Sequence, residues 1–190
     1  MKLRIDKTSH LAVRCAILAK MTLGMPDNIP LKDLESAIAS FRVSGSFATP
    51  GDALLLPSWR DEDWKQLFRF TSTRRVMAGD ALIRHGEPDR TLYFVLYGDL
   101  EVTARSGDGL TMGRVAQVGA GSVLGELAFF DGGPRSAGAW AVDDCEVAAM
   151  TLDQYSAFEQ SSPALARDLL FALGRILAIR LRRTTAKLVR

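Results

Sequence analysis

Residues 121–137 of this 190-residue chain read Gly-Ser-Val-Leu-Gly-Glu-Leu-Ala-Phe-Phe-Asp-Gly-Gly-Pro-Arg-Ser-Ala. The run sets one acid, Glu126, and one guanidinium, Arg135, nine residues apart around an apolar turn and a Gly-Gly-Pro bend. An ionised carboxylate only accepts hydrogen bonds, so Glu126 suits a sugar hydroxyl. A guanidinium is a planar fork of donors, so Arg135 suits phosphate oxygens. The run therefore predicts a pocket for a small ligand with one phosphate and one sugar hydroxyl.

The residues around Glu126 are expected to begin a helix, whose first turn would hold Gly125, Glu126, Leu127 and Ala128. Backbone N–H groups of a first helical turn lack partners within the helix and carry partial positive charge, so they can bind an anion. Two alternatives stay open at this stage. Glu126 can instead cap the helical turn by its favourable interaction with the helix dipole, and Arg135 can be an ordinary solvated loop arginine.

The run resembles the phosphate-binding cassette of the cyclic-nucleotide-binding domain family, which includes the nucleotide-binding half of bacterial catabolite activator proteins and kinase regulatory subunits. The family pattern is Gly-Glu-Leu-Ala, several variable residues, and then Pro-Arg-small-Ala. Residues 125–128 and 134–137 match both parts, and they keep the Glu and the Arg whose loss usually marks a domain that no longer binds nucleotide. Segments within residues 79–100 resemble the family's first strands, so the resemblance covers residues 55–190.

The resemblance implies a set of ligand-contacting residues. In the family, the Ala137 position offers its backbone N–H to the phosphate, and a hydroxyl at the Ser136 position can reach phosphate or base. A Thr on the long helix of catabolite activator proteins contacts the adenine, which points here to Thr184 or Thr185. The similarity at Arg-Ser-Ala and at residues 145–148 favours cAMP over cGMP as the regulatory ligand. The implied ligand-binding residues are Gly125, Glu126, Leu127, Ala128, Arg135, Ser136, Ala137 and Thr184.

Composition excludes several other classes of protein. An apolar fraction of 47% with 24% charged residues is ordinary for a globular protein, and no apolar run reaches the ~20 residues that span a bilayer. The two cysteines, Cys15 and Cys145, cannot form a disulfide framework or a zinc site, so a cytoplasmic location is expected. His10 and His85 are the only histidines, and no nucleophile elbow occurs. We therefore expect neither a metal, nor another cofactor, nor enzyme activity.

The spacing of apolar stretches between residues 74 and 152 predicts the fold. Short stretches alternate with Gly and Asp turns, which is typical of an antiparallel barrel or jelly roll. Predicted strands cover residues 81–83, 92–96, 100–103, 111–118, 137–142 and 147–151. Predicted helices cover residues 61–70, 153–159 and 163–187. The expected class is mainly β with flanking helices: an antiparallel, cupin-like jelly-roll β-barrel with an N-terminal helical segment and a long C-terminal helix.

Three segments are expected along the chain. Residues 1–50 form an N-terminal helical segment plus linker, residues 51–160 the cyclic-nucleotide-binding barrel with its lead-in helix, and residues 161–190 the long C-terminal helix. Helical spacing in the first segment covers residues 9–25 and 31–41. A small docking unit is favoured there over a helix-turn-helix, because the first helix is too apolar and the second carries few basic side chains.

The long helix carries more apolar positions than one stripe needs. One stripe can pack on the barrel, and a second copy of the helix is the simplest cover for the remainder. The N-terminal helices are the alternative cover. From Arg167 onward, seven basic residues also stand against one acid, Asp168, which indicates either a solvated face or contact with an acidic partner or nucleic acid. We expect a homodimer through this helix.

These features predict a non-enzymatic cyclic-nucleotide sensor whose ligand repositions the C-terminal helix and so changes a surface for a dimer or an unidentified protein partner. One alternative is a scaffold domain of the same fold that binds no nucleotide. Another is a DNA-binding regulator acting through its N-terminal helices. In catabolite activators a winged helix-turn-helix normally follows the long helix, and this sequence ends at Arg190 without room for one. Nucleic acid is therefore not an expected partner. Membrane insertion is not expected either, because no apolar run is long enough to span a bilayer.

Overall fold

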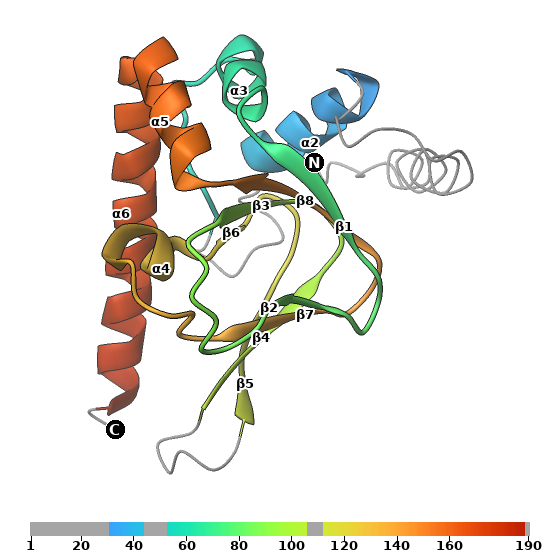
Figure 1. The fold of residues 1–190 in the computed structure, drawn as a ribbon, viewed down its shortest axis with the longest axis vertical. Coiled ribbons are helices and arrows are strands. Elements are labelled where there is room, and N and C mark those ends of the chain that lie inside the picture. Colours follow the sequence, from blue (N-terminus) through green and yellow to red (C-terminus); the bar gives the residue numbers. More distant parts are fainter. Residues whose placement is uncertain (1–30, 44–52, 106–111, 189–190) are drawn as a thin grey trace, which may run out of the picture.

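Two facing four-stranded antiparallel sheets form the centre of the molecule in a computed structural model that describes residues 31–43, 53–105 and 112–188 (Figure 1). The first sheet has the strand order β1-β8-β3-β6, and the second has the order β2-β7-β4-β5. The strands are β1 (Ser72–Val76), β2 (Ala81–Ile83), β3 (Leu92–Tyr97), β4 (Leu100–Arg105), β5 (Met112–Val118), β6 (Val123–Leu124), β7 (Gly138–Ala141) and β8 (Cys145–Met150). The jelly-roll prediction is confirmed, in the form of a two-sheet sandwich.

Strand β3 shows how the sequence produces two layers of core. Tyr93 and Val95 point toward the second sheet and belong to the core between the sheets. Leu92, Phe94 and Leu96 alternate with them and belong to the core between the first sheet and the helices. Because side chains of a strand alternate between faces, a strand buried on both faces reads as an uninterrupted apolar run.

Five helices complete the described part of the chain: α2 (Leu31–Val43), α3 (Asp61–Phe68), α4 (Glu126–Asp131), α5 (Leu152–Ser161) and α6 (Pro163–Leu188). The helix predicted over residues 31–41 is confirmed as α2, which buries Leu34, Ile38 and Phe41 in the core between helices and sheet. The predicted helix over residues 9–25 and the linker lie outside the described residues.

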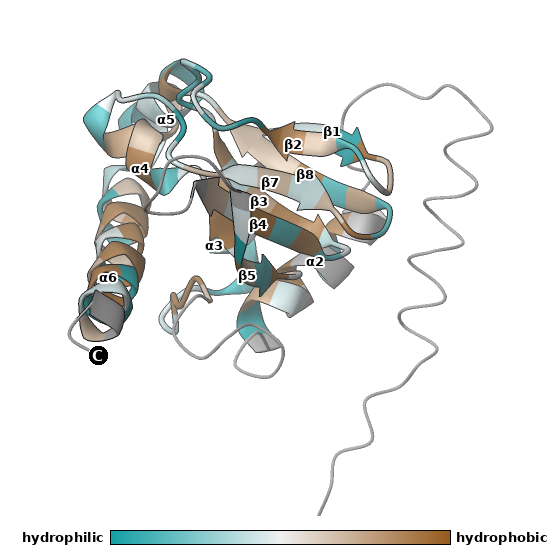
Figure 2. Ribbon diagram, turned by 90° about the horizontal axis from the view of Figure 1, so that it is seen from below, coloured by the Kyte–Doolittle hydropathy of each residue, from teal (hydrophilic) through white to brown (hydrophobic). Residues whose placement is uncertain are grey.

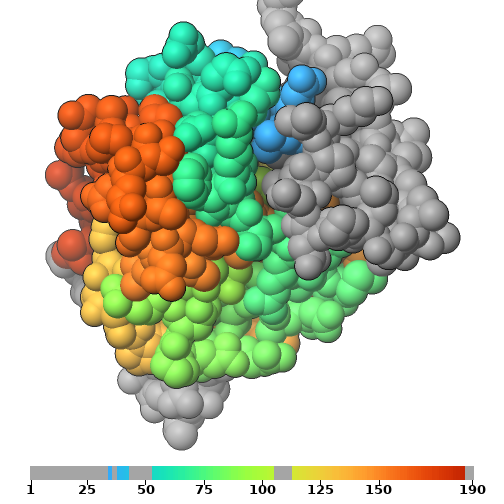
Figure 3. Space-filling view, turned by 45° about the horizontal axis from the view of Figure 1, so that its top comes forward, coloured from blue at the N-terminus to red at the C-terminus, as the bar shows by residue number. Residues whose placement is uncertain are grey.

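The helices cover the outer face of the first sheet. Helices α3 (teal) and α5 (orange) adjoin on one face of the molecule (Figure 3), where Gln66 Nε2 donates to Ser161 Oγ at 3.1 Å. Helix α6 runs along the opposite side of the molecule from α2 in both ribbon views (Figures 1 and 2). Among the described residues, no helix combines the length and apolarity needed to cross a bilayer.

Helix α6 uses its two ends differently. Its N-terminal half packs on the core through a stripe of apolar residues, namely Ala166, Leu169, Ala172, Leu173 and Ile176. Its C-terminal half passes α4 (Figure 1). Apolar residues also remain exposed on α6, whose ribbon has brown, hydrophobic turns in Figure 2, since Phe171 is 82% and Leu181 68% exposed. The fold thus brings a long helix with an uncovered apolar face beside the segment that carries the motif.

Candidate functional site

A pocket of about 650 Å³ lies between the cassette, defined here as residues 125–137, the inner side of the second sheet and helix α6. This volume is within the range of small-molecule sites. All eight residues that the sequence predicted for the ligand line it, including Thr184 from α6. Apolar side chains of the second sheet form another wall, namely Ile83, Val102, Val115 and Val118. Thr185, the alternative to Thr184, is not among the lining residues, while both hydroxyls donate within the helix, that of Thr184 to Arg180 O and that of Thr185 to Leu181 O, each at 3.0 Å.

The cassette begins at a residue that must be glycine. Gly125 has φ 85° and precedes the first residue of α4. A Cβ atom there would overlap Nη1 of Arg135 and would lie 2.7 Å from Thr91 O. Because only glycine combines a left-handed backbone with so close an approach, the Gly-Glu-Leu-Ala pattern has a steric reason at its first position.

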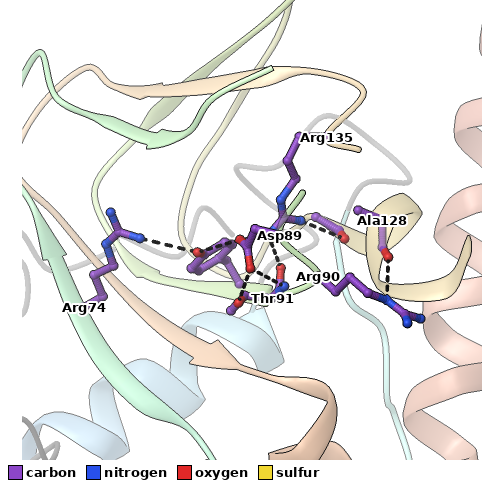
Figure 4. Close-up of polar contacts among 8 residues, drawn as sticks. Arg74, Asp89, Arg90, Thr91, Ala128 and Arg135 are labelled. Atoms are coloured by element: carbon purple, nitrogen blue, oxygen red, sulfur yellow. Dashed lines mark hydrogen bonds and ion pairs between the residues drawn. The ribbon is translucent and has the colours of Figure 1, made fainter. Parts of the chain in front are cut away.

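Arg135 is buried at 3% exposure, and most of its donors are already used (Figure 4). Its Nη2 binds the Asp89 carboxylate and donates to Thr91 O at 2.6 Å, while Nη1 donates to Gly125 O at 3.1 Å. Its Cζ lies 5.5 Å from the ring centroid of Tyr93. The Nε atom is buried and has no hydrogen-bond partner among the described residues. The predicted fork therefore bonds largely to the protein itself, and Nε is the buried donor left over.

Asp89 is a site residue that sequence reasoning missed. Besides Arg135, it accepts hydrogen bonds from Thr91 N at 3.1 Å and Thr91 Oγ1 at 2.7 Å. Burial alone would raise the pKa of Asp89, but the hydrogen bonds from Arg135 and Thr91 outweigh it and hold the pKa below its ordinary value. Asp89 is therefore ionised near neutral pH and fixes the orientation of Arg135. Its signal in the sequence was only a turn, Gly-Glu-Pro-Asp, with an acid at its end.

Glu126 is equally buried, at 4% exposure, but its partner comes from a different element. Arg180 of α6 approaches it with Nη1 at 2.5 Å from Oε1, and Arg180 Nη2 donates to Val123 O at 3.1 Å. Sequence reasoning placed Arg180 only in a basic run. Its spacing of four residues from Thr184 puts both on one helix face and is the signal that was available. The structure thus joins the cassette acid to the long helix.

Comparisons with known proteins bear on the family and the fold of the chain. The family model described as "Cyclic nucleotide-binding domain" matches residues 73–162. The CRP-like cAMP-activated global transcriptional regulator of Mycobacterium tuberculosis is 31% identical over 110 residues, which cover 58% of this chain and 47% of that protein. The crystal structure of the N-terminal domain of a transcriptional regulator from Streptomyces coelicolor is 30% identical, covers 70% of this chain and 92% of that one, and has a TM-score of 0.57.

A third comparison concerns the fold. The crystal structure of a cyclic nucleotide-binding domain from Methylobacillus flagellatus covers 83% of each chain with a TM-score of 0.69 at 22% identity. The chain spans about half the length of the curated regulator it matches. Two of these relatives are named as transcriptional regulators. The expectation that nucleic acid is an unlikely partner therefore gains no support, whereas regulation is the function those names state.

Proposed function

We propose, from the premise that this chain belongs to the cyclic nucleotide-binding domain family, that it is a regulatory sensor whose ligand occupies the pocket between cassette and α6. The observation that carries the proposal is the burial of an acid and a guanidinium, Glu126 and Arg135, in the same pocket. Burying a charged group is costly unless the charge is compensated. The two buried charges stand at the two motif positions where the family pattern has an acid and an arginine.

Each part of the nucleotide has a proposed partner. The cyclic phosphate would accept from Arg135 Nε and from the segment of Ser136 and Ala137. The ribose hydroxyl would donate to Glu126, and the base would lie against Thr184. We favour cAMP over cGMP, because a relative with 31% identity is named as cAMP-activated and the motif resembles that of catabolite activators.

The ion pair between Glu126 and Arg180 supports a route from ligand to helix. A ribose hydroxyl that donates to Glu126 changes the surroundings of the same carboxylate that holds Arg180. A ligand that binds one position of α6 better than another shifts the population toward that position. We therefore propose that the nucleotide repositions the C-terminal half of α6, which carries Arg180 and Thr184.

The output would be a dimer surface on α6. Phe171, Gly174, Ala178, Leu181 and Thr185 are all exposed and follow one another at spacings of three and four residues. This is the spacing of a coiled-coil seam, in which the same face of a second helix provides the complementary surface. We call these five residues the α6 seam. We propose that this seam packs against the α6 seam of a second copy of the chain.

Charges beside the seam favour a parallel arrangement. Arg175 and Arg182 each follow an inner seam position by one residue and are exposed. In an antiparallel pair these arginines would face the same arginines of the other copy, whereas in a parallel pair they face Leu170 and Leu177. Sedimentation velocity should report a dimer that Leu181→Glu dissociates. Val142→Glu, at an exposed apolar residue in the bend that follows β7, should not, and a wild-type monomer contradicts the dimer.

Calorimetric titration tests the sensor itself. Folded protein freed of carried-over nucleotide should bind cAMP most tightly, cGMP less tightly and linear AMP least, because the open phosphate of AMP carries additional charge and a different shape. Heat with AMP equal to that with cAMP would contradict recognition of the cyclic phosphate. No heat with either cyclic nucleotide would favour the scaffold alternative.

A further inference from the structure

Arg90 reaches the cassette from outside the motif. Its Nε donates to Ala128 O at 3.3 Å, and its Nη2 donates to Phe129 O at 3.0 Å (Figure 4 shows the first contact). Both carbonyls belong to α4, so the guanidinium lies at the carbonyl end of that helix. Cations at this end of a helix are favoured by the helix dipole. Ala128 O also accepts from Gly132 N at 3.0 Å, so Arg90 is a second donor to that carbonyl.

Helix α4 needs such support because it is short. It has six residues, whereas isolated helices shorter than about 12 residues are marginal in water. Gly125 provides no side-chain cap at its start, and Gly132 ends it in a left-handed conformation. A Cβ atom at Gly132 would lie 3.4 Å from Arg90 Cζ, so the chain turns directly beside the guanidinium.

The neighbouring residue holds the other end of the cassette. Asp89 binds the Arg135 side chain, and the same loop pairs with the Arg135 backbone. Gly86 N donates to Arg135 O at 2.8 Å, and Arg135 N donates to Glu87 O at 3.0 Å. Two adjacent residues of opposite charge thus hold the cassette at its helix and at its arginine, and fix its position on the sandwich.

We propose that Arg90 is a positioning residue for nucleotide binding, because it keeps α4, and with it Glu126, in the form that accepts the ligand. The proposal rests on the proposed function. Arg90 is exposed, so its truncation opens no cavity in either core. Its effect on the cassette should therefore separate from its effect on overall stability.

The test compares Arg90→Ala with Arg90→Lys and with a matched control, Arg84→Ala. Arg84 lies in the same loop and is exposed, but its guanidinium faces Glu87 at 3.9 Å. Hydrogen exchange of the nucleotide-free protein should be faster in Arg90→Ala at the amides of Phe129 and Gly132, which bond within α4. Arg90→Lys should restore part of the protection, and Arg84→Ala should match the wild type.

Titration with cAMP completes the test. Arg90→Ala should bind about three- to tenfold more weakly with an unchanged melting temperature, and Arg90→Lys should recover part of the loss. Affinity and exchange equal to those of Arg84→Ala would overturn the proposal. Faster exchange with unchanged affinity would overturn it as well, since order in the cassette would then not govern binding. A wild type that binds no cyclic nucleotide contradicts the proposed function, while the exchange comparison still decides whether Arg90 orders the cassette.

Discussion

Glu126 and Arg135 belong to the same cassette and are buried to the same degree, but they are held by different parts of the molecule. Arg135 is bound within the sandwich, by Asp89, Thr91 and Gly125. Glu126 is bound by Arg180, from a helix that packs on the sandwich from outside. The difference indicates that the guanidinium is a fixed anchor, whereas the acid connects the pocket to α6. Four substitutions test this comparison.

The largest effect is expected from Arg135→Ala. A hydrogen bond to a charged group contributes roughly 1.5–3 kcal/mol, and each 1.4 kcal/mol is a tenfold change in affinity, so loss of the anchor should weaken cAMP binding about 100-fold. Stability should fall too, because Asp89 loses its partner. Titration and thermal unfolding measure both. Arg135→Lys keeps the charge without the planar fork and should recover only part of the affinity; full recovery would show that the fork is unimportant.

Glu126→Gln should have the next largest effect, about a tenfold loss of affinity, because an amide accepts the ribose hydroxyl without a charge. It should also loosen the C-terminal half of α6, since Arg180 loses its ion pair. Hydrogen exchange over α6 measures this second effect. The anchor variant Arg135→Ala is the control, and the comparison fails if that variant loosens α6 equally.

Arg180→Ala should change affinity by less than about tenfold, since its side chain is partly exposed and the pair is screened by solvent. Its larger consequence is expected in coupling. Bound nucleotide should alter exchange of α6 in the wild type and should cease to do so in the variant. Arg182→Ala, two residues away on an exposed face, should behave like the wild type. A variant that still responds to nucleotide would place the route elsewhere.

Asp89→Asn should have the smallest effect of the four substitutions, which is a loss of stability that depends on pH. The pKa of Asp89 is lowered from its ordinary value of 3.8, so the carboxylate contributes stability above that value and loses it as the pH falls through the folded-state pKa. The variant should therefore be less stable than the wild type at about pH 6, and the difference should shrink at about pH 3. Urea unfolding at both pH values measures it; a difference that persists at low pH would mean that the carboxylate's charge is not its source.

The sequence predicted six strands that carry apolar side chains and missed one mostly polar strand and one very short strand. Six of the eight described strands were predicted close to their observed bounds. Strand β1 was missed because its residues Ser72–Arg75 are polar and mostly exposed, which leaves no apolar alternation to detect. Strand β6 has two residues and is shorter than any periodicity can register.

The site divides along the same line. All eight predicted residues line one pocket, because the motif is nearly contiguous and the helix contact followed from a family resemblance. Asp89 and Arg180 were missed as partners because they lie 46 and 54 residues from the charges they hold. Pairing at that separation is set by the packing of sandwich and helix, which local patterns do not encode.

The glycine that begins the cassette gives a criterion for descendants of this chain. One added carbon at Gly125 would displace Arg135 while leaving every ionisable group in the sequence. Related chains that carry any larger residue at this position should no longer bind the proposed ligand, even where the acid and the arginine are kept. Inspection for the two charged residues alone would then overcount the receptors in a genome.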